Sequence, residues 1–229
     1  MSEPQQTITV WDIPTRIFHW LIVALFLFQW FSMEFMDDWM EYHELAGYAF
    51  LTLLLFRLVW GFLGPEYVRF SHFLHSPTTI FNYSKSIFDR NAAPHAGHNP
   101  LGGLSVIVLL LLLLVQAISG LFMTDDILFY GPYYNSVSDE TQKLMSRLHH
   151  MSFDMLVWLI ALHIVAVLFY VFFKKQSIVA AMIHGRKNVG DGKSIGGSKL
   201  LVAVVVLLVC CGFVYGLVDY FAPETIDYF

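Results

Sequence analysis

Uncharged, hydrophobic stretches of about twenty residues recur along this sequence, separated by shorter polar segments. They lie at roughly 14–36, 38–63, 101–123, 139–173 and 199–221. A helix that crosses about 30 Å of hydrocarbon at about 1.5 Å per residue needs about 20 such residues. The pattern predicts an all-α membrane protein with five transmembrane helices, which we take as a single integral membrane domain over residues 1–229.

Two connections between these stretches have patterns of their own. Ser76-Pro77 is a helix start, and the apolar residues that follow at helical spacing predict a short helix on the membrane surface at about 77–88. The connection between the fourth and fifth stretches is rich in glycine and basic residues. This composition predicts a flexible, solvated loop.

Composition supports a membrane protein and excludes several classes of function. Hydrophobic residues make up 57% of the chain and charged residues only 14%, against about 25% charged in soluble domains. Nucleic-acid binding is therefore not expected, and no catalytic triad or other independent catalytic motif is present. The only cysteines, Cys210 and Cys211, are adjacent, which excludes a disulfide framework and a covalent Cys-x-x-Cys-His haem site. We expect no cleaved signal peptide, because the N-terminus lacks a basic region followed by a short apolar stretch.

The basic residues predict the orientation of the chain in the membrane. Eleven of the thirteen Lys and Arg residues fall on one side of the expected helices, and only Lys143 and Arg147 fall on the other. Because cytoplasmic loops carry the excess of Lys and Arg, we expect a cytoplasmic N-terminus and a periplasmic C-terminus. The opposite side is acidic, with Asp37, Asp38, Glu41, Asp125, Asp126, Asp139, Glu140, Glu224 and Asp227.

Four histidines lie at two matching depths of the expected bundle. His19 is near the cytoplasmic end of the first helix, and His43 is near the external end of the second. On the fourth helix His149 is external, and His163 lies fourteen residues further in, or about 21 Å. Ionisable residues within membrane spans are costly, so they are candidates for function.

Helix geometry selects the members of each pair. Fourteen residues bring His149 and His163 to within about 40° of the same face, whereas His150 points about 140° away from His163. Two pairs of neutral imidazoles match what two bis-histidine haems need. We predict two haem b groups, with His43 and His149 as iron ligands of the outer one and His19 and His163 of the inner one.

Two arginines fit the inner haem of this prediction. Arg57 follows His43 by fourteen residues, on the same face, and Arg16 precedes His19 by three. Both side chains are candidates to bind haem propionates at membrane depth. The alternative for Arg57 is a cation that extends toward the membrane surface. Lys143 and Arg147 are candidates to bind propionates of the outer haem, and the alternative for them is a role as ordinary loop cations.

The remaining histidines have a plainer interpretation. His72, His75, His95, His98 and His184 lie in cytoplasmic loops, where a structural role is more common than ligation. His95-x-x-His98 lacks the further ligands of a closed zinc site. Any one histidine of the two pairs would also more often be a hydrogen-bonded residue than a ligand, so the prediction depends on the set.

The sequence resembles the bacterial cytochrome b561 group, which includes b-type cytochrome subunits of nickel-iron hydrogenases and formate dehydrogenases. The resemblance covers nearly the whole chain. Its marks are Val10-Trp11-Asp12, Thr15-Arg16, Phe18-His19-Trp20, His43-Glu44, Arg57-Leu58-Val59-Trp60-Gly61, Asn99-Pro100-Leu101-Gly102 and the spacing from His149 to Leu162-His163. It implies a four-helix haem-binding core with an added fifth helix, and haem ligands at His19, His43, His149 and His163. Many relatives have an acidic residue where this chain has His150, so the surroundings of the outer haem differ.

The resemblance also implies a function. It suggests electron transfer between the quinone pool, with quinone as an exchangeable substrate, and a periplasmic partner, either a c-type cytochrome or a dehydrogenase or hydrogenase subunit. One alternative is an autonomous superoxide:quinone oxidoreductase, which would be active without a protein partner. A haem-free metal transporter or membrane anchor is a further alternative, which would lack the reduced b-type absorption band.

Overall fold

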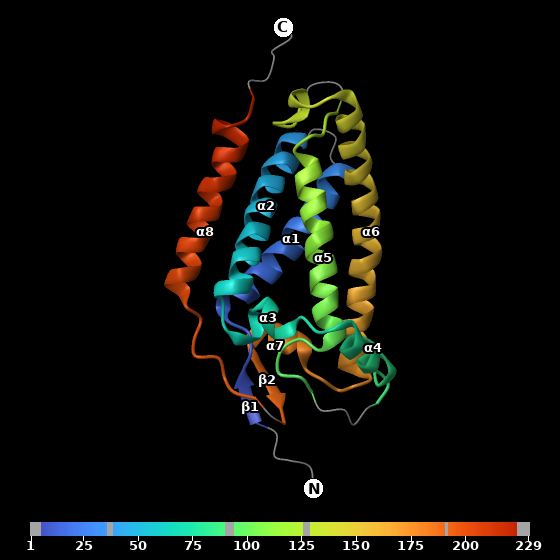
Figure 1. The fold of residues 1–229 in the computed structure, drawn as a ribbon, viewed down its shortest axis with the longest axis vertical. Helices are drawn as coiled ribbons and strands as arrows, with labels where there is room; N and C mark the ends of the chain where they lie inside the picture. The colour runs from blue at the N-terminus through green and yellow to red at the C-terminus, as the bar shows by residue number, and fades with distance from the viewer. Residues whose placement is uncertain (1–5, 36–38, 90–93, 126–128, 191, 224–229) are drawn as a thin grey trace. The chain divides into compact units, whose positions relative to one another are not determined.

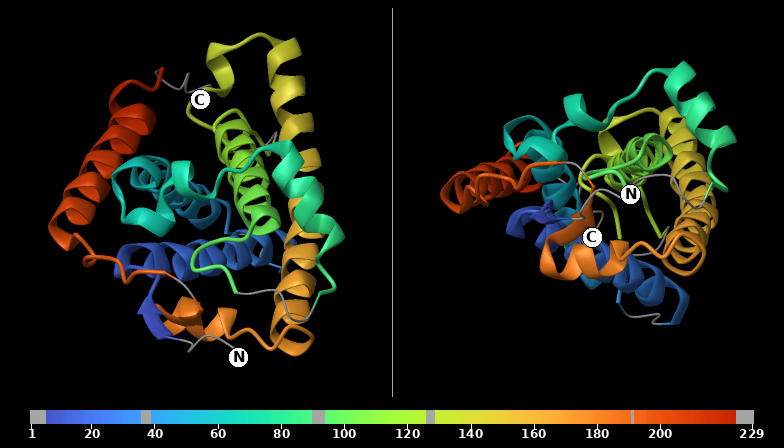
Figure 2. Two further views of the ribbon diagram at one scale, coloured as in Figure 1. Left: turned by 60° about the horizontal axis from the view of Figure 1, so that its bottom comes forward. Right: turned by 90° about the horizontal axis from the view of Figure 1, so that it is seen from below.

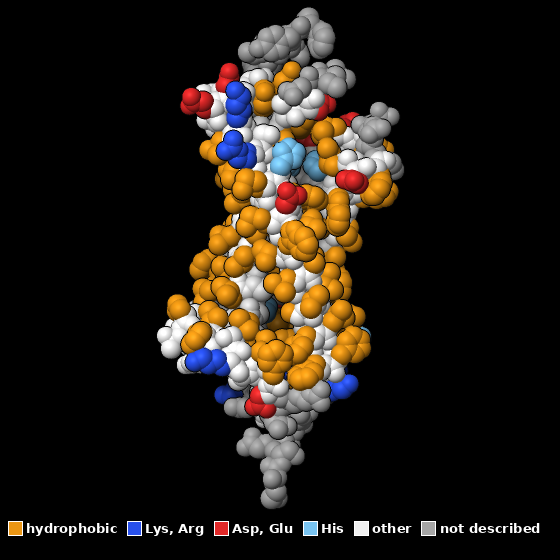
Figure 3. Space-filling model, turned by 90° about the vertical axis from the view of Figure 1, so that its right-hand side faces the viewer, with side chains coloured by type: hydrophobic (Ala, Val, Ile, Leu, Met, Phe, Trp, Pro, Cys, Tyr) orange, Lys and Arg blue, Asp and Glu red, His pale blue; other side chains and the backbone are white. Residues whose placement is uncertain are grey.

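The predicted long apolar helices are present in the computed structural model, which describes residues 6–35, 39–89, 94–125, 129–190 and 192–223. Within these ranges five helices are long and apolar enough to cross a membrane. They are α1 (Ile13–Phe35), α2 (Met40–Leu63), α5 (Pro100–Gly120), α6 (Asp139–Phe172) and α8 (Leu200–Tyr215), the last continued by a π-helical turn, Gly216–Tyr220. The predicted all-α membrane fold is therefore confirmed. On the face in Figure 3, hydrophobic side chains cover most of the helix surfaces.

Polar caps fix the starts of several helices. Asn99 Oδ1 accepts a hydrogen bond from Gly102 N at 2.7 Å, and Pro100 occupies the first turn of α5. Ser76 Oγ accepts from Thr79 N at 3.2 Å at the start of α4 (Pro77–Lys85). Both arrangements satisfy amide groups that the first turn of a helix leaves without partners. The short helix predicted at about 77–88 is present and ends at Lys85.

The third long helix ends earlier than its hydrophobicity indicates. Its α-helical part stops at Gly120 rather than at about 123. The amides of Leu121, Phe122 and Met123 bond to carbonyls three residues back, at 3.1 to 3.3 Å, so the chain tightens into a turn. Met123 O then accepts a hydrogen bond from Gly131 N at 2.8 Å. Leu121, Phe122 and Met123 therefore continue the apolar pattern of the sequence but not the α-helix.

The glycine-rich connection before α8 contains a strand, so the expectation of a wholly flexible, solvated loop is wrong. β2 (Arg186–Val189) pairs antiparallel with β1 (Gln6–Thr9), and Ile8 lies opposite Lys187. Lys187 and Val189 are buried while Arg186 and Asn188 are exposed. Gly185, at φ +80°, ends the preceding helix α7 (Ile178–His184), and its carbonyl accepts from Val10 N and Trp11 N. Figure 2 shows the two strands side by side.

Two compact units divide the chain, and each takes parts of all five long helices. The first comprises Met1–His19, Arg57–Leu109 and Leu159–Ala203, and the second Trp20–Phe56, Leu110–Trp158 and Val204–Phe229. The first unit holds β1, β2, α4, α7 and α3 (Phe70–Phe73). Gly103 lies against α3, where an added Cβ would stand 2.4 Å from Phe73 O. Among the described residues, Glu66–Val68 and Tyr134–Ser136 form short 3₁₀ turns.

In the second unit, α8 packs on α2 and on the turn after α5. Leu51, Leu121 and Val214 form a buried cluster there. Tyr133 OH donates to Leu217 O at 2.7 Å, which ties the π-helical turn to the loop between α5 and α6. Side chains of the second unit therefore hold α8 against α2 and against the turn after α5.

Candidate functional site

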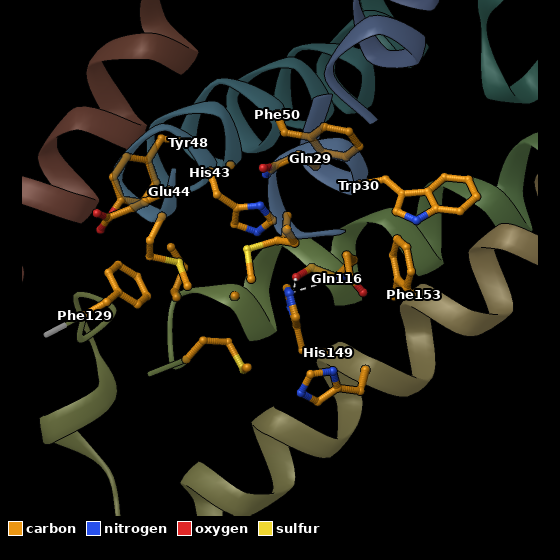
Figure 4. A pocket seen from close by; sticks show the side chains of 18 of the residues that line it. Gln29, Trp30, His43, Glu44, Tyr48, Phe50, Gln116, Phe129, His149 and Phe153 are labelled. Carbon is orange, nitrogen blue, oxygen red and sulfur yellow. Dashed lines mark hydrogen bonds between the residues drawn. The ribbon is translucent and has the colours of Figure 1, made fainter. Parts of the chain in front are cut away.

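A cavity of about 410 Å³ in the second unit brings the predicted outer pair together. His43 from α2 and His149 from α6 both line it and point toward one another (Figure 4). They are close enough to interact electrostatically. The volume lies in the range of small-molecule and cofactor pockets.

The surroundings of His43 select one ring tautomer. Its Nδ1 lies 3.1 Å from Ser32 Oγ, and the Ser32 hydroxyl donates to Gln29 O at 3.0 Å. Because the single hydroxyl proton of Ser32 is used in that bond, the Nδ1 of His43 must carry the proton and donate. The lone pair of His43 is therefore on Nε2, which is the arrangement of a metal-binding imidazole.

The surroundings of His149, on the opposite wall of the cavity, select the same ring tautomer. Its Nδ1 lies 3.0 Å from the Gln116 carbonyl oxygen, which can only accept, so Nδ1 carries the proton. Ser119 Oγ also lies 3.2 Å from this nitrogen. The Nε2 lone pair accepts from the Gln116 side-chain amide at 3.0 Å, and Ser152 Oγ donates to the other end of that amide at 2.5 Å. Sequence patterns missed Gln116, Ser119 and Ser152, because single polar residues in an apolar helix have no spacing signal.

The rest of the cavity is mainly aromatic and aliphatic. Trp30, Phe50, Phe129 and Phe153 contribute to the lining, and at Gly120 an added Cβ would stand 3.2 Å from His149 Cε1. Its polar residues include Glu44, which accepts a hydrogen bond from Tyr48 OH, together with His150, Glu34 and Asp125. Lys143 and Arg147 are exposed and do not line the cavity.

The first unit holds the predicted inner residues. His19 from α1 and His163 from α6 are half-buried and interact electrostatically. Arg16 Nη1 donates to Ile183 O of α7, which holds the guanidinium beside the start of α1. The structure therefore groups His19 and His163 within the first unit and His43 and His149 within the second.

Arg57 is buried, with 4% of its surface exposed. Its Nη2 donates to Val68 O at 3.2 Å, and the guanidinium carbon lies 5.1 Å from the centre of the Phe70 ring. Asp12 interacts with Arg57 electrostatically and accepts a hydrogen bond from Trp60 Nε1 at 3.0 Å. Burial raises the pKa of Asp12. Among the described residues, nothing hydrogen-bonds to Arg57 Nη1.

His98 was expected to be an ordinary loop residue, but it lies within this group. Its ring is 4.7 Å from that of Trp11 and 4.8 Å from that of Phe73. Burial lowers the pKa of His98 to about 3, and the positive charge of Arg57 acts in the same direction. His98 is therefore neutral at physiological pH. A position in a loop does not predict this burial, which depends on α3 packing over the start of α5.

The residues present fit the haem groups that the sequence predicts. Arg57 Nη1 and Arg16 Nε are buried donors with no hydrogen-bond acceptor among the described residues, which suits both to a haem propionate. The cavity between His43 and His149 is mainly apolar and of cofactor size. Across the described part of the chain, no three His, Cys, Asp or Glu side chains form a metal-binding group.

Comparison with known proteins places these residues in context. Residues 10–185 match the family model of prokaryotic cytochrome b561. A protein of Rhizobium leguminosarum bv. viciae named "Probable Ni/Fe-hydrogenase B-type cytochrome subunit" is 22% identical, over 82% of this chain and 91% of that protein. No solved structure matches. The family match includes all four paired histidines and ends before α8.

Proposed function

The chain belongs to the prokaryotic cytochrome b561 family, and we propose that it conducts electrons through two b haems between a quinone pool and a periplasmic redox partner. It is a multi-pass bacterial membrane protein and an electron-transfer b-type cytochrome. The observation that carries the proposal is the grouping of the histidines, one pair in each compact unit.

In this proposal His43 and His149 would hold the outer haem through Nε2, and the Gln116 side-chain amide would give up its bond to His149 Nε2. His19 and His163 would hold the inner haem. When bound, each haem supplies a one-electron iron couple. The protein's own work is to hold the imidazoles in the ligand tautomer, through Ser32 for His43 and the Gln116 carbonyl for His149. Arg57 and Arg16 would neutralise propionates of the inner haem.

Orientation and partner belong to the proposal too. The distribution of basic residues supports a cytoplasmic N-terminus and a periplasmic C-terminus in the inner membrane. The name of the Rhizobium relative supports a hydrogenase-type enzyme subunit as the partner, and a periplasmic c-type cytochrome fits the same role. Quinone is proposed as the electron donor or acceptor within the membrane.

A reduced-minus-oxidised absorption spectrum with haem quantitation tests the proposal. We expect a low-spin b-type spectrum and two haems per chain in the purified protein, from the two histidine pairs. One haem per chain would contradict the paired assignment, and a spectrum without a b band would favour the haem-free transporter. Quinone-linked superoxide oxidation by the purified chain alone would favour the autonomous enzyme instead.

A further inference from the structure

His98 and Arg57 both contact one buried ring of the first unit, that of Phe73. The centre of the Phe73 ring lies 4.8 Å from that of His98 and 6.0 Å from the guanidinium carbon of Arg57. The ring of Trp11 contacts His98 as well, with 4.7 Å between the ring centres. Aromatic packing therefore holds the His98 ring close enough to Arg57 for the two side chains to interact electrostatically.

Each of these two polar side chains keeps one buried nitrogen without a hydrogen bond. Among the described residues, nothing bonds to His98 Nδ1 or to Arg57 Nη1. The other terminal nitrogen of Arg57, Nη2, donates to Val68 O, so the guanidinium is anchored while Nη1 stays available. A buried polar nitrogen without a partner is costly, so we expect both nitrogens to have a partner in the working protein.

The chain's own carboxylate beside Arg57 does not supply this partner. Asp12 interacts electrostatically with Arg57. Its Oδ2 accepts a hydrogen bond from Trp60 Nε1 at 3.0 Å, and its Oδ1 is itself buried without a hydrogen bond. Asp12 therefore compensates part of the charge of Arg57 but leaves both Nη1 and His98 Nδ1 free.

The chemistry of the two nitrogens limits what the partner can be. His98 is neutral at physiological pH, because burial lowers its pKa to about 3. Its Nδ1 can therefore donate or accept one hydrogen bond, whereas Arg57 Nη1 can only donate. Carboxylate oxygens accept from both kinds of donor, and they form strong bonds with a guanidinium.

The two nitrogens lie in the same compact unit as the predicted inner histidine pair. His98 interacts electrostatically with His163, which interacts in the same way with His19. A haem held by His19 and His163 would bring two propionates, and hence four carboxylate oxygens, into this unit. Propionates are therefore the carboxylates that suit the unpaired nitrogens of His98 and Arg57.

We propose that His98 is a further haem-binding residue, whose Nδ1 donates a hydrogen bond to a propionate of the inner haem, beside Arg57. The inference rests on the proposed function and adds a neutral donor to its two arginines. A neutral donor spreads the negative charge of a propionate without adding a charge of its own. Its loss leaves more negative charge near the iron and favours the ferric state.

Redox titration and resonance Raman spectroscopy of the purified, haem-loaded chain test the proposal. His98→Leu should keep both haems and shift the propionate bending band. It should also lower the reduction equilibrium constant of the inner haem about threefold, which is about 30 mV for a one-electron couple. The potential of the outer haem should stay unchanged and is the internal control.

Two amide variants identify the nitrogen that acts. The amide nitrogen of Asn stands two bonds from Cβ, as Nδ1 of histidine does, whereas that of Gln reaches about as far as Nε2. His98→Asn should therefore restore the wild-type potential and Raman band, and His98→Gln should not. The matched control is His95→Leu, which removes an exposed imidazole three residues away and should change neither measurement.

The outcomes separate this inference from the proposed function. Wild-type values of both the inner potential and the Raman band in His98→Leu would show that the unpaired nitrogens bind only water, and would overturn the proposal. Equal shifts at both haems, or equal values in His98→Asn and His98→Leu, would show a packing role and overturn it too. Loss of the inner haem in His98→Leu that His98→Asn reverses would support it. A wild-type chain without two b haems would instead refute the proposed function, and this inference with it.

Discussion

The guanidinium of Arg57 is buried, and its positive charge acts on the groups around it. The side chain has a carbonyl partner, two aromatic neighbours and Asp12 in its vicinity, yet Nη1 has no hydrogen-bond acceptor among the described residues. Lysine in its place would carry the same charge on a single atom, without the planar fork that suits a carboxylate. Substitutions at Arg57 therefore separate the effect of its charge from the effect of its side-chain geometry on a bound carboxylate.

We predict that Arg57→Gln lowers the midpoint potential of the inner haem by about 50 mV or more, because loss of a buried positive charge favours ferric over ferrous haem. Arg57→Lys should give a smaller shift. Redox titration of the b-type absorbance measures both potentials in one sample, with the outer haem as internal control. Equal shifts at the two haems would indicate a general stability role for Arg57.

Spacing along the helices predicted the two pairs of histidines. The residues that contact each histidine depend on packing between elements, and the sequence pattern did not predict them. The alternatives at positions 149 and 150 differed by about 100° around one helix, and His149 is the one that bonds to Gln116 on α5. His98 could not be assigned in this way, because its burial comes from Trp11 and Phe73, far away in the sequence.

At the scale of elements, long apolar helices were predictable and short paired elements were not. Five runs of hydrophobic residues give a strong signal, since each must satisfy its backbone within the bilayer. β1 has four residues and β2 has four, more than 170 positions apart, so neither has enough alternation to be recognised. The cap at Ser76 was recognisable because Pro77 follows it directly.

Helix α6 carries one histidine of each proposed pair, which leads to a prediction about haem content. His149→Ala and His163→Ala should each remove about one haem per chain, and the double variant both, because each imidazole serves a different iron. His150→Ala is the matched control and should keep both haems, although its ring is only 6.2 Å from that of His149. Haem content is measured against protein concentration. A full complement in His163→Ala would refute the pairing.

At the scale of the whole molecule, the two compact units differ in charge. Basic residues gather in the connections of the first unit, and acidic residues in the loops of the second. Asp139 and Glu140 are exposed in the first turn of α6. Asp125 is half-buried, and its Oδ1 accepts from Phe129 N at 2.8 Å. Five further acidic residues of the predicted surface lie outside the described residues: Asp37, Asp38, Asp126, Glu224 and Asp227.

These acidic side chains lead to a prediction about the periplasmic partner. A transient redox encounter needs only a small interface, and opposite charge mainly raises its association rate. The partner should therefore present a basic patch around its cofactor. Neutralising Asp125, Asp126, Asp139 and Glu140 together should slow electron exchange about tenfold at low ionic strength and flatten its dependence on salt.

Two comparisons separate docking from stability in this experiment. D139N/E140Q spares the Asp125 loop contact and should show part of the effect, at the small stability cost of losing acids from a helix N-terminus. Glu66→Gln, an exposed acid of the first unit, should leave the exchange rate unchanged.

Stopped-flow measurement over a series of salt concentrations gives the rates, and reduction of the haems by quinol should be unaffected throughout. Because electrostatic steering acts through long-range attraction, it must weaken as salt screens the charges. If the quadruple variant exchanged electrons at the original rate at every ionic strength, the acidic loops would have no part in docking, and their charge would reflect only which side of the membrane they occupy.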